Sequence, residues 1–143
     1  MIDKYIKNWL IKANNDLKTV EHELSLPEKE IVKDVVCFHC QQAVEKYLKA
    51  FLIYHKVEVE RTHDIEHLLN RCAIIDKDFD NIEVGNLSSF GVNVRYPDDF
   101  YVPGVEEVKF YYDLTKRVKD LVLAKLDIEE IEKEIDSEMQ NLK

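Results

Sequence analysis

The loop around Arg95 contains the side chains best suited to binding a phosphate. Arg95 has a permanent positive charge and several donors in a fixed fork, a geometry that matches a phosphate group. Tyr96 and Tyr101 flank it, and aromatic rings of this kind stack on nucleic-acid bases. Asp98 and Asp99 oppose this interpretation, because either carboxylate can neutralise Arg95. From the loop alone, a structural anchor between arginine and aspartate is therefore the simpler interpretation.

A second group of polar side chains lies in residues 27–56, a long segment without glycine or internal proline. Its first half is rich in side chains that form hydrogen bonds: His39, Gln41, Gln42, Glu45 and Lys46. Residues three and four apart share one face of a helix, so several of these side chains lie together if the segment is helical. With the Arg95 loop, they form the constellation that we interpret as a candidate binding site.

The cysteines and histidines do not complete a metal site. Cys37 and Cys40 have half of a zinc-site spacing, but a closed site needs four ligands, and Cys72 has no neighbouring Cys or His. We interpret all three cysteines as buried core residues. His63 and His67 are four residues apart, but the glutamate of an HExxH site is missing, and we interpret both as residues at a helix start. The sequence therefore predicts no metal and no cofactor.

Composition excludes several other classes of function. Three glycines are too few for a glycine-rich nucleotide loop, and the sequence contains no nucleophile elbow and no dinucleotide fingerprint. The formal net charge of −9 gives no general attraction to phosphate backbones. Nucleic acid would therefore need a local basic site or a basic partner.

The elements that position these residues are predicted to be helices. Apolar residues recur at helical spacing, and glycine and proline are scarce. The predicted helices cover residues 2–24, 27–56, 65–75, 78–94 and 105 onward. Gly85 and Gly91 weaken the fourth of them. The chain is thus predicted to be an all-α bundle of four to five helices, with residues 95–104 as a loop.

Two domains of unequal size follow from this division: the bundle over residues 1–126 and an acidic helical extension over residues 127–143. The extension has apolar residues at coiled-coil-like spacing from Ile128 to Leu142. No stretch has the length of a signal peptide's apolar region or of a membrane span. The expected location is a reducing cytoplasm, with free thiols and no membrane contact.

Four pieces of the sequence, in order, resemble the HEPN domain family, the higher eukaryote and prokaryote nucleotide-binding domains. The longest is the string FHCQQAVEKYLKA at residues 38–50, which resembles the family's long helix. The others are Trp9, Ala13, Asp16 and Leu17 of the opening helix, His63-Asp64-Ile65 followed by Leu68-Leu69, and Arg95-Tyr96-Pro97-Asp98. The resemblance covers most of the chain, to about residue 126.

The resemblance implies an up-and-down helical bundle, often a homodimer, that acts with a minimal nucleotidyltransferase in toxin–antitoxin or related modules. Many HEPN domains are metal-independent ribonucleases, in which an arginine is followed after four to six residues by a histidine. Arg95 matches the arginine, but Phe100, Tyr101 and Val102 stand where the histidine is expected. An unperturbed phenol with a pKa of about 10 makes Tyr101 a poor base at neutral pH.

Two hypotheses follow, and a third is weaker. The first is a dimeric binding module for a nucleotide, an RNA or a nucleotidyltransferase; its predicted binding residues are His39, Gln42, Lys46, His63, Asp64, Arg95, Tyr96 and Asp98. The second is a divergent ribonuclease with Arg95 and Tyr101 as catalytic residues and His39 or His63 as alternative proton carriers. The third is modification of Tyr96 or Tyr101 by a partner enzyme.

Overall fold

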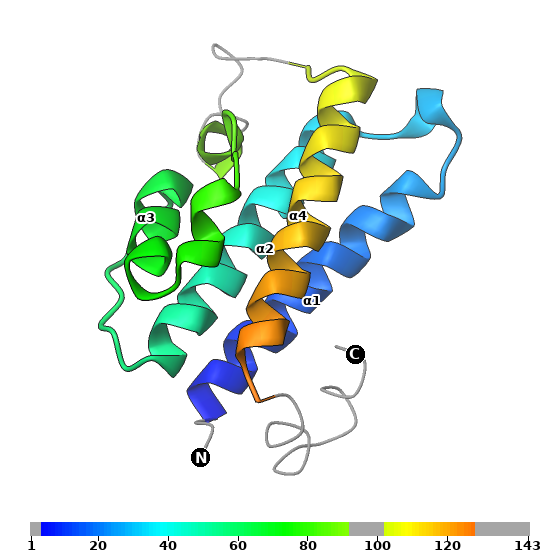
Figure 1. Ribbon diagram of the computed structural model, residues 1–143. Helices are drawn as coiled ribbons and strands as arrows, with labels where there is room; N and C mark the ends of the chain where they lie inside the picture. The colour runs from blue at the N-terminus through cyan, green and yellow to red at the C-terminus, as the bar shows by residue number, and fades with distance from the viewer. Residues whose placement is uncertain (1–3, 92–101, 128–143) are drawn as a thin grey trace.

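The computed structural model describes residues 4–91 and 102–127, and over these residues the predicted all-α bundle is confirmed (Figure 1). The α-helices are α1 (Lys4–Leu24), α2 (Lys33–Tyr54), α3 (Ile65–Ile75) and α4 (Val105–Lys125). Three short 3-10 turns join them: η1 (Glu28–Glu30), η2 (Lys77–Asn81) and η3 (Leu87–Gly91). The described part of the chain contains no β-strand, and none of its helices is long and apolar enough to cross a membrane.

The second helix begins later than the sequence suggested, which is a correction to its predicted start at Pro27. Pro27 instead precedes the 3-10 turn η1, and Ile31 and Val32 are extended. The amide of Val32 donates to the Glu23 carboxylate over 2.9 Å. This bond ties the start of α2 to the end of α1, so the chain reverses through extended backbone rather than through continuous helix.

The single helix predicted over residues 78–94 is wrong for the residues that the structure describes. Two 3-10 turns, η2 and η3, replace it. Between them Gly85 has a φ of 54°, in the left-handed region that glycine adopts without steric cost and that ends a right-handed helix. The predicted helix 65–75 is confirmed at both ends, and α4 begins at Val105 as predicted. The apolar seam at residues 128–142 lies outside the described residues.

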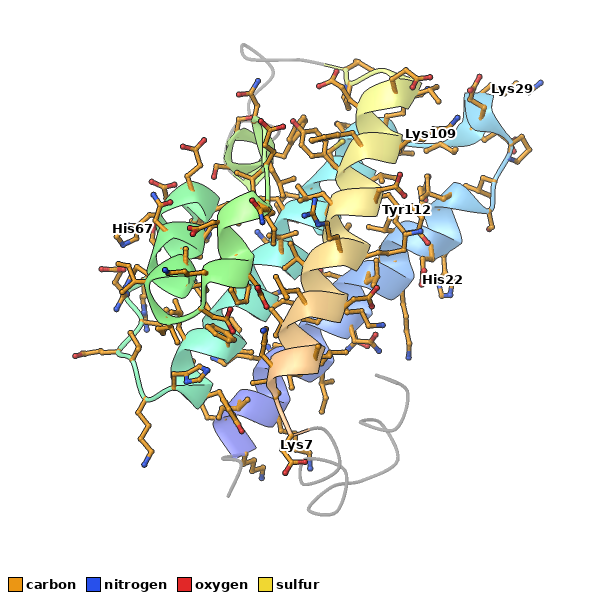
Figure 2. The ribbon with its side chains drawn as sticks, viewed as in Figure 1. Lys7, His22, Lys29, His67, Lys109 and Tyr112 are labelled. Atoms are coloured by element: carbon orange, nitrogen blue, oxygen red, sulfur yellow. The ribbon has the colours of Figure 1, made fainter. Side chains whose placement is uncertain are left out.

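Helix α2 is the centre of the bundle, with α1 antiparallel to it (Figure 1). Helix α4 packs against α2 and also reaches α1 through Tyr112, which points toward α1 in Figure 2 and donates to Glu21 over 2.8 Å. The 55–64 connection returns along α2, so α3 lies beside the second half of α2. There the Cys72 thiol of α3 donates to the Leu48 carbonyl over 3.7 Å.

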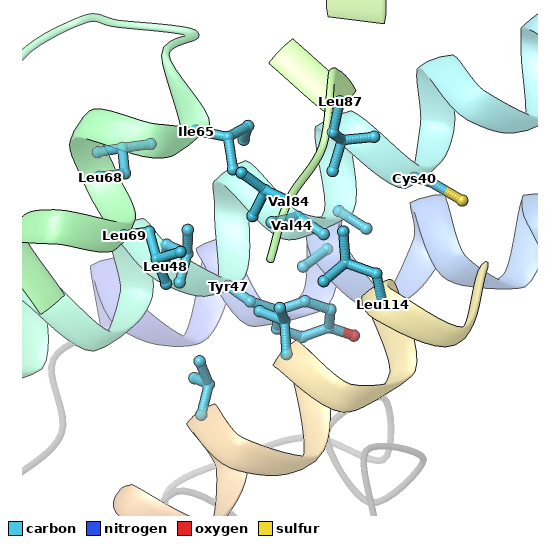
Figure 3. Packing of buried hydrophobic residues seen from close by; sticks show 14 of the residues in the cluster. Cys40, Val44, Tyr47, Leu48, Ile65, Leu68, Leu69, Val84, Leu87 and Leu114 are labelled. Atoms are coloured by element: carbon cyan, nitrogen blue, oxygen red, sulfur yellow. The ribbon is translucent and has the colours of Figure 1, made fainter. Parts of the chain in front are cut away.

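The core is continuous around α2 and includes all three cysteines, as predicted. Cys37, Cys40 and Cys72 are free thiols and fully buried. Figure 3 shows α2 residues such as Val44 and Tyr47 packed among side chains of α3, α4 and the segment before η3. Five buried polar residues come from α1 and α2: Asn14, Asp16, Gln41, Glu45 and Lys49. Asp16, Gln41, Glu45 and Lys49 belong to the candidate site.

Removing the hydroxyl group should have opposite effects on stability at two buried tyrosines. The Tyr47 hydroxyl has no hydrogen-bond partner among the described residues, whereas that of Tyr111 accepts from the Asn86 amide over 3.1 Å. We expect Tyr47→Phe to be neutral or to stabilise by about 1 kcal/mol, and Tyr111→Phe to destabilise by about 1 kcal/mol because the amide loses its acceptor. Urea unfolding of both variants measures the difference, and equal losses would contradict it.

Candidate functional site

Asp16 of α1 joins two of the predicted site residues of α2. Its Oδ1 lies 2.9 Å from His39 Nδ1, and its Oδ2 accepts a short hydrogen bond from Lys46 Nζ. His39 and Lys46 are seven residues apart, so they share a helical face two turns apart. The Asp16 side chain is only 12% exposed. One largely buried carboxylate therefore fixes both an imidazole and an ammonium group at the α1–α2 surface.

Glu45 is the centre of a second and more deeply buried network. Its carboxylate accepts from Gln41 Nε2 over 3.0 Å and from Lys49 Nζ over 2.9 Å. His63 Nδ1 lies 2.8 Å from the same carboxylate. The Glu45 and Lys49 side chains are 5% and 7% exposed, whereas that of His63 is 61% exposed. A buried carboxylate thus holds a largely exposed imidazole in one orientation.

Gln42 belongs to this network indirectly. Its amide donates to Gln41 Oε1 over 2.6 Å, and Gln41 reaches the His63 carbonyl over 3.4 Å. Asp64 does not belong to it. The Asp64 carboxylate accepts from the His67 amide over 3.1 Å and caps the start of α3. Of the predicted residues, the structure therefore places His39 and Lys46 in the Asp16 network and Gln42 and His63 in the Glu45 network, and it gives Asp64 a structural role.

A groove of about 550 Å³ lies beside the two networks. It is lined from α1, the middle of α2 and the start of the connection to α3, by Tyr5, Asn8, Trp9, Lys12, Glu45, Lys46, Lys49, Arg61, Thr62 and His63. Four of these side chains are cations and one is a carboxylate. In a chain of net charge −9, this groove is a local cationic surface.

His63, just before α3, and His67, in its first turn, contact different carboxylates. His67 lies on the outer side of α3 (Figure 2), and its Nε2 is 2.8 Å from Glu60 Oε1. That contact, with Arg71 as a lesser cause, lowers the pKa of Glu60. His63 and His67 are therefore at the start of α3, as predicted, with separate carboxylate partners. No cluster of three or more metal-ligating side chains occurs within residues 4–91 and 102–127.

The three core thiols are buried, which favours their neutral form. Burial raises the pKa values of Cys37, Cys40 and Cys72 to about 12 each. The thiolate is the nucleophile and the metal ligand, so these cysteines serve packing in the folded protein.

Four predicted residues, Arg95, Tyr96, Asp98 and Tyr101, lie outside the described residues, so their roles remain predictions. The structure in turn adds functional candidates that sequence reasoning missed: Tyr5, Trp9, Lys12, Asp16, Lys49 and Arg61. Tyr5, Trp9 and Lys12 recur at helical spacing on one face of α1, which was an available indication. Arg61 lies in an irregular connection, where no periodicity could have placed it beside α1.

A sequence model of the HEPN domain family matches residues 6–136. The fold is similar to the crystal structure of an archaeal HEPN homologue, with a TM-score of 0.58 and 22% sequence identity. That similarity covers 84% of this chain and 96% of the other. No protein of curated function matches the sequence.

The Glu45 network gives a stability prediction. Glu45→Gln leaves the buried Lys49 without its counter-charge, so we expect a loss of about 3 kcal/mol. Combining it with Lys49→Met, which removes the stranded charge, should recover part of that loss in a double-mutant cycle. Glu60→Gln, at an exposed ion pair, is the matched control and should be nearly neutral. Chemical denaturation of the wild type, both single variants, the double variant and Glu60→Gln measures these losses, and similar losses for Glu45→Gln and Glu60→Gln would contradict the assignment.

The thiols give a prediction about pH. Burial raises the pKa of these thiols in the folded protein to about 12. The folded state therefore favours the neutral thiol. This contribution to the free energy of unfolding is fully present below the pKa of the unfolded thiols and is lost as the pH rises toward 12. In the native protein at about pH 8 we expect almost no reaction with a thiol reagent such as DTNB, and reaction of all three after unfolding. Rapid labelling of any thiol in the native protein would contradict this.

Proposed function

The chain belongs to the HEPN domain family, and from this premise we propose that it is a cytoplasmic nucleotide- or RNA-binding module. We propose further that it acts as a homodimer together with a minimal nucleotidyltransferase, as part of a toxin–antitoxin-like system. The proposed binding surface is the polar face of α2 together with the Arg95 loop.

One observation carries the proposal: two buried carboxylates hold cationic and imidazole groups in place at the surface. Asp16 orients His39 and Lys46, and Glu45 orients His63. Groups whose rotamers are fixed in advance bind a ligand with less loss of conformational entropy than free side chains do. Because the net charge is −9, an anionic ligand needs a local cationic surface of this kind or a basic partner.

Exposed apolar side chains at one end of the bundle support the proposed protein contacts. Leu26 and Val32 come from the α1–α2 connection, and Val102 comes from the segment just before α4. Figure 1 shows these two segments at the same end of the molecule. Exposed apolar residues that gather at one place are typical of protein–protein contacts. The acidic chain also complements a basic partner, which would accelerate their association.

A divergent ribonuclease is the second candidate, and the geometry of His63 favours it. With Nδ1 held by Glu45 and the ring largely exposed, the other nitrogen, Nε2, can exchange protons with a substrate. Arg95 would then clamp the scissile phosphate, and His63 or His39 would replace the histidine that the loop lacks. Tyr101 keeps its place as a catalytic prediction of this hypothesis.

A binding and cleavage assay on the full chain distinguishes the two candidate functions. For the binding module we expect labelled single-stranded RNA to bind without being cleaved in the presence of a chelator. Arg95→Ala should weaken binding about tenfold through loss of a charge-assisted contact, while Lys29→Ala, an exposed charge of η1, should not. Light scattering gives the oligomeric state, and a monomer would contradict the proposed homodimer.

Cleavage by the wild type that disappears in both Arg95→Ala and His63→Ala would favour the ribonuclease. Absence of any binding to RNA or nucleotides by the folded protein would overturn the proposed module. Unfolding of Arg95→Ala, read by circular dichroism, would show that Arg95 is a structural anchor and not a ligand contact.

A further inference from the structure

We infer that the groove between α1, α2 and residues 61–63 binds a single nucleotide, with its phosphate at Lys12 and Arg61 and its base against Trp9. The inference rests on the proposed function and deepens it. It narrows the ligand to a single nucleotide and assigns it a binding site that does not involve the Arg95 loop. The groove's charge, its aromatic wall and its size support it independently.

The charges of the groove leave two cations for a ligand. Lys46 is paired with Asp16, and Lys49 is paired with Glu45. Lys12 and Arg61 are exposed and have no ion-pair partner among the described residues, although both line the same groove. They approach it from different elements, α1 and the connection to α3. An anion held between them is therefore contacted from two sides, which suits a phosphate with several acceptor oxygens.

His63 adds a donor or acceptor at the same rim. Because Glu45 holds its Nδ1, its Nε2 is the nitrogen left for a ligand. Its side chain is 61% exposed and its ring is fixed in orientation. His63 Nε2 could contact a phosphate oxygen or a ribose hydroxyl without a conformational change in the protein. Such a contact would orient the ligand between the cations and the α1 wall.

The α1 wall of the groove is aromatic. The Tyr5 and Trp9 rings contact one another edge to face, with centroids 6.0 Å apart, and both line the groove. Lys49 Nζ lies 5.4 Å from the centroid of the Trp9 ring, which limits the movement of that ring. An indole is a good stacking surface for any base, so this wall favours a nucleotide over inorganic phosphate.

The size of the groove fits the ligand class. Its volume of about 550 Å³ lies within the range of sites that hold small molecules and cofactors, roughly 300–1,000 Å³. The nucleotide could be free or could be the end of a single-stranded RNA, and both sources present the same phosphate, ribose and base.

Trp9 is the only tryptophan of the chain, so its fluorescence reports on this groove alone. We would titrate the full chain with AMP, adenosine and inorganic phosphate, and confirm each result by calorimetry. We expect saturable quenching by AMP, with affinity at least about tenfold above that for adenosine or phosphate because only AMP engages both the cations and the aromatic wall. Trinucleotides with and without a 5′-phosphate distinguish an RNA end from a free nucleotide.

The decisive variant is Lys12→Ala combined with Arg61→Ala. Its matched control is Lys18→Ala combined with Lys29→Ala, which removes the same charge from exposed positions outside the groove. We expect the first pair to weaken AMP binding about tenfold or more and the control pair to leave it unchanged. Circular dichroism checks that both remain folded.

Equal affinities for AMP in the two double variants, or no AMP-dependent change in Trp9 fluorescence, would overturn the inference. The proposed function has a separate readout. If labelled RNA still binds and Arg95→Ala still weakens it, the groove assignment alone is wrong. If neither RNA nor any nucleotide binds the folded protein, the proposed function fails as well.

Discussion

The buried carboxylate of Glu45 is the constraint on which the rest of the site depends. A charge removed from water needs an opposite charge and further hydrogen bonds, or it would destabilise the fold by several kcal/mol. Lys49 supplies the charge, and Gln41 and His63 supply the remaining partners. Because His63 belongs to the connection before α3, satisfying Glu45 also fixes that connection against α2. The position of Arg61 and the far wall of the groove follow from this bond.

Asp16 has the corresponding role on the other side of α2. It links α1 to α2 through His39 and Lys46, so the wall of the groove that contains Trp9 is held at a set distance from the α2 face. Each carboxylate uses one lysine of α2 for its own neutralisation. Lys12 and Arg61, which line the same groove, have no ion-pair partner among the described residues. In the inferred nucleotide site, the two cations that contact the phosphate are thus different side chains from the lysines that neutralise the buried carboxylates.

Much of the fold could be predicted, because periodicity and caps are local properties of the sequence. The helix 65–75 and the start of α4 at Val105 came from such patterns. The failures were at Pro27 and Gly85, where backbone geometry in a turn overrides helical periodicity.

For the site, sequence placed His39 and Lys46 on one face, but it could not show that Asp16 lies between them. That fact depends on how α1 packs on α2, as does the presence of Arg61 and Lys12 in one groove.

The groove can attract an anion although the chain has a negative net charge, because charges in salt solution interact only over short distances. At physiological ionic strength the field of a charge is screened over about 8 Å, so a ligand within the groove responds mainly to the groove's own side chains. A long RNA would extend beyond that range and meet the acidic surface of a chain with a net charge of −9. A single nucleotide, or one RNA end, avoids this repulsion. The charge distribution therefore favours a short anionic ligand, unless a basic partner covers the acidic surface.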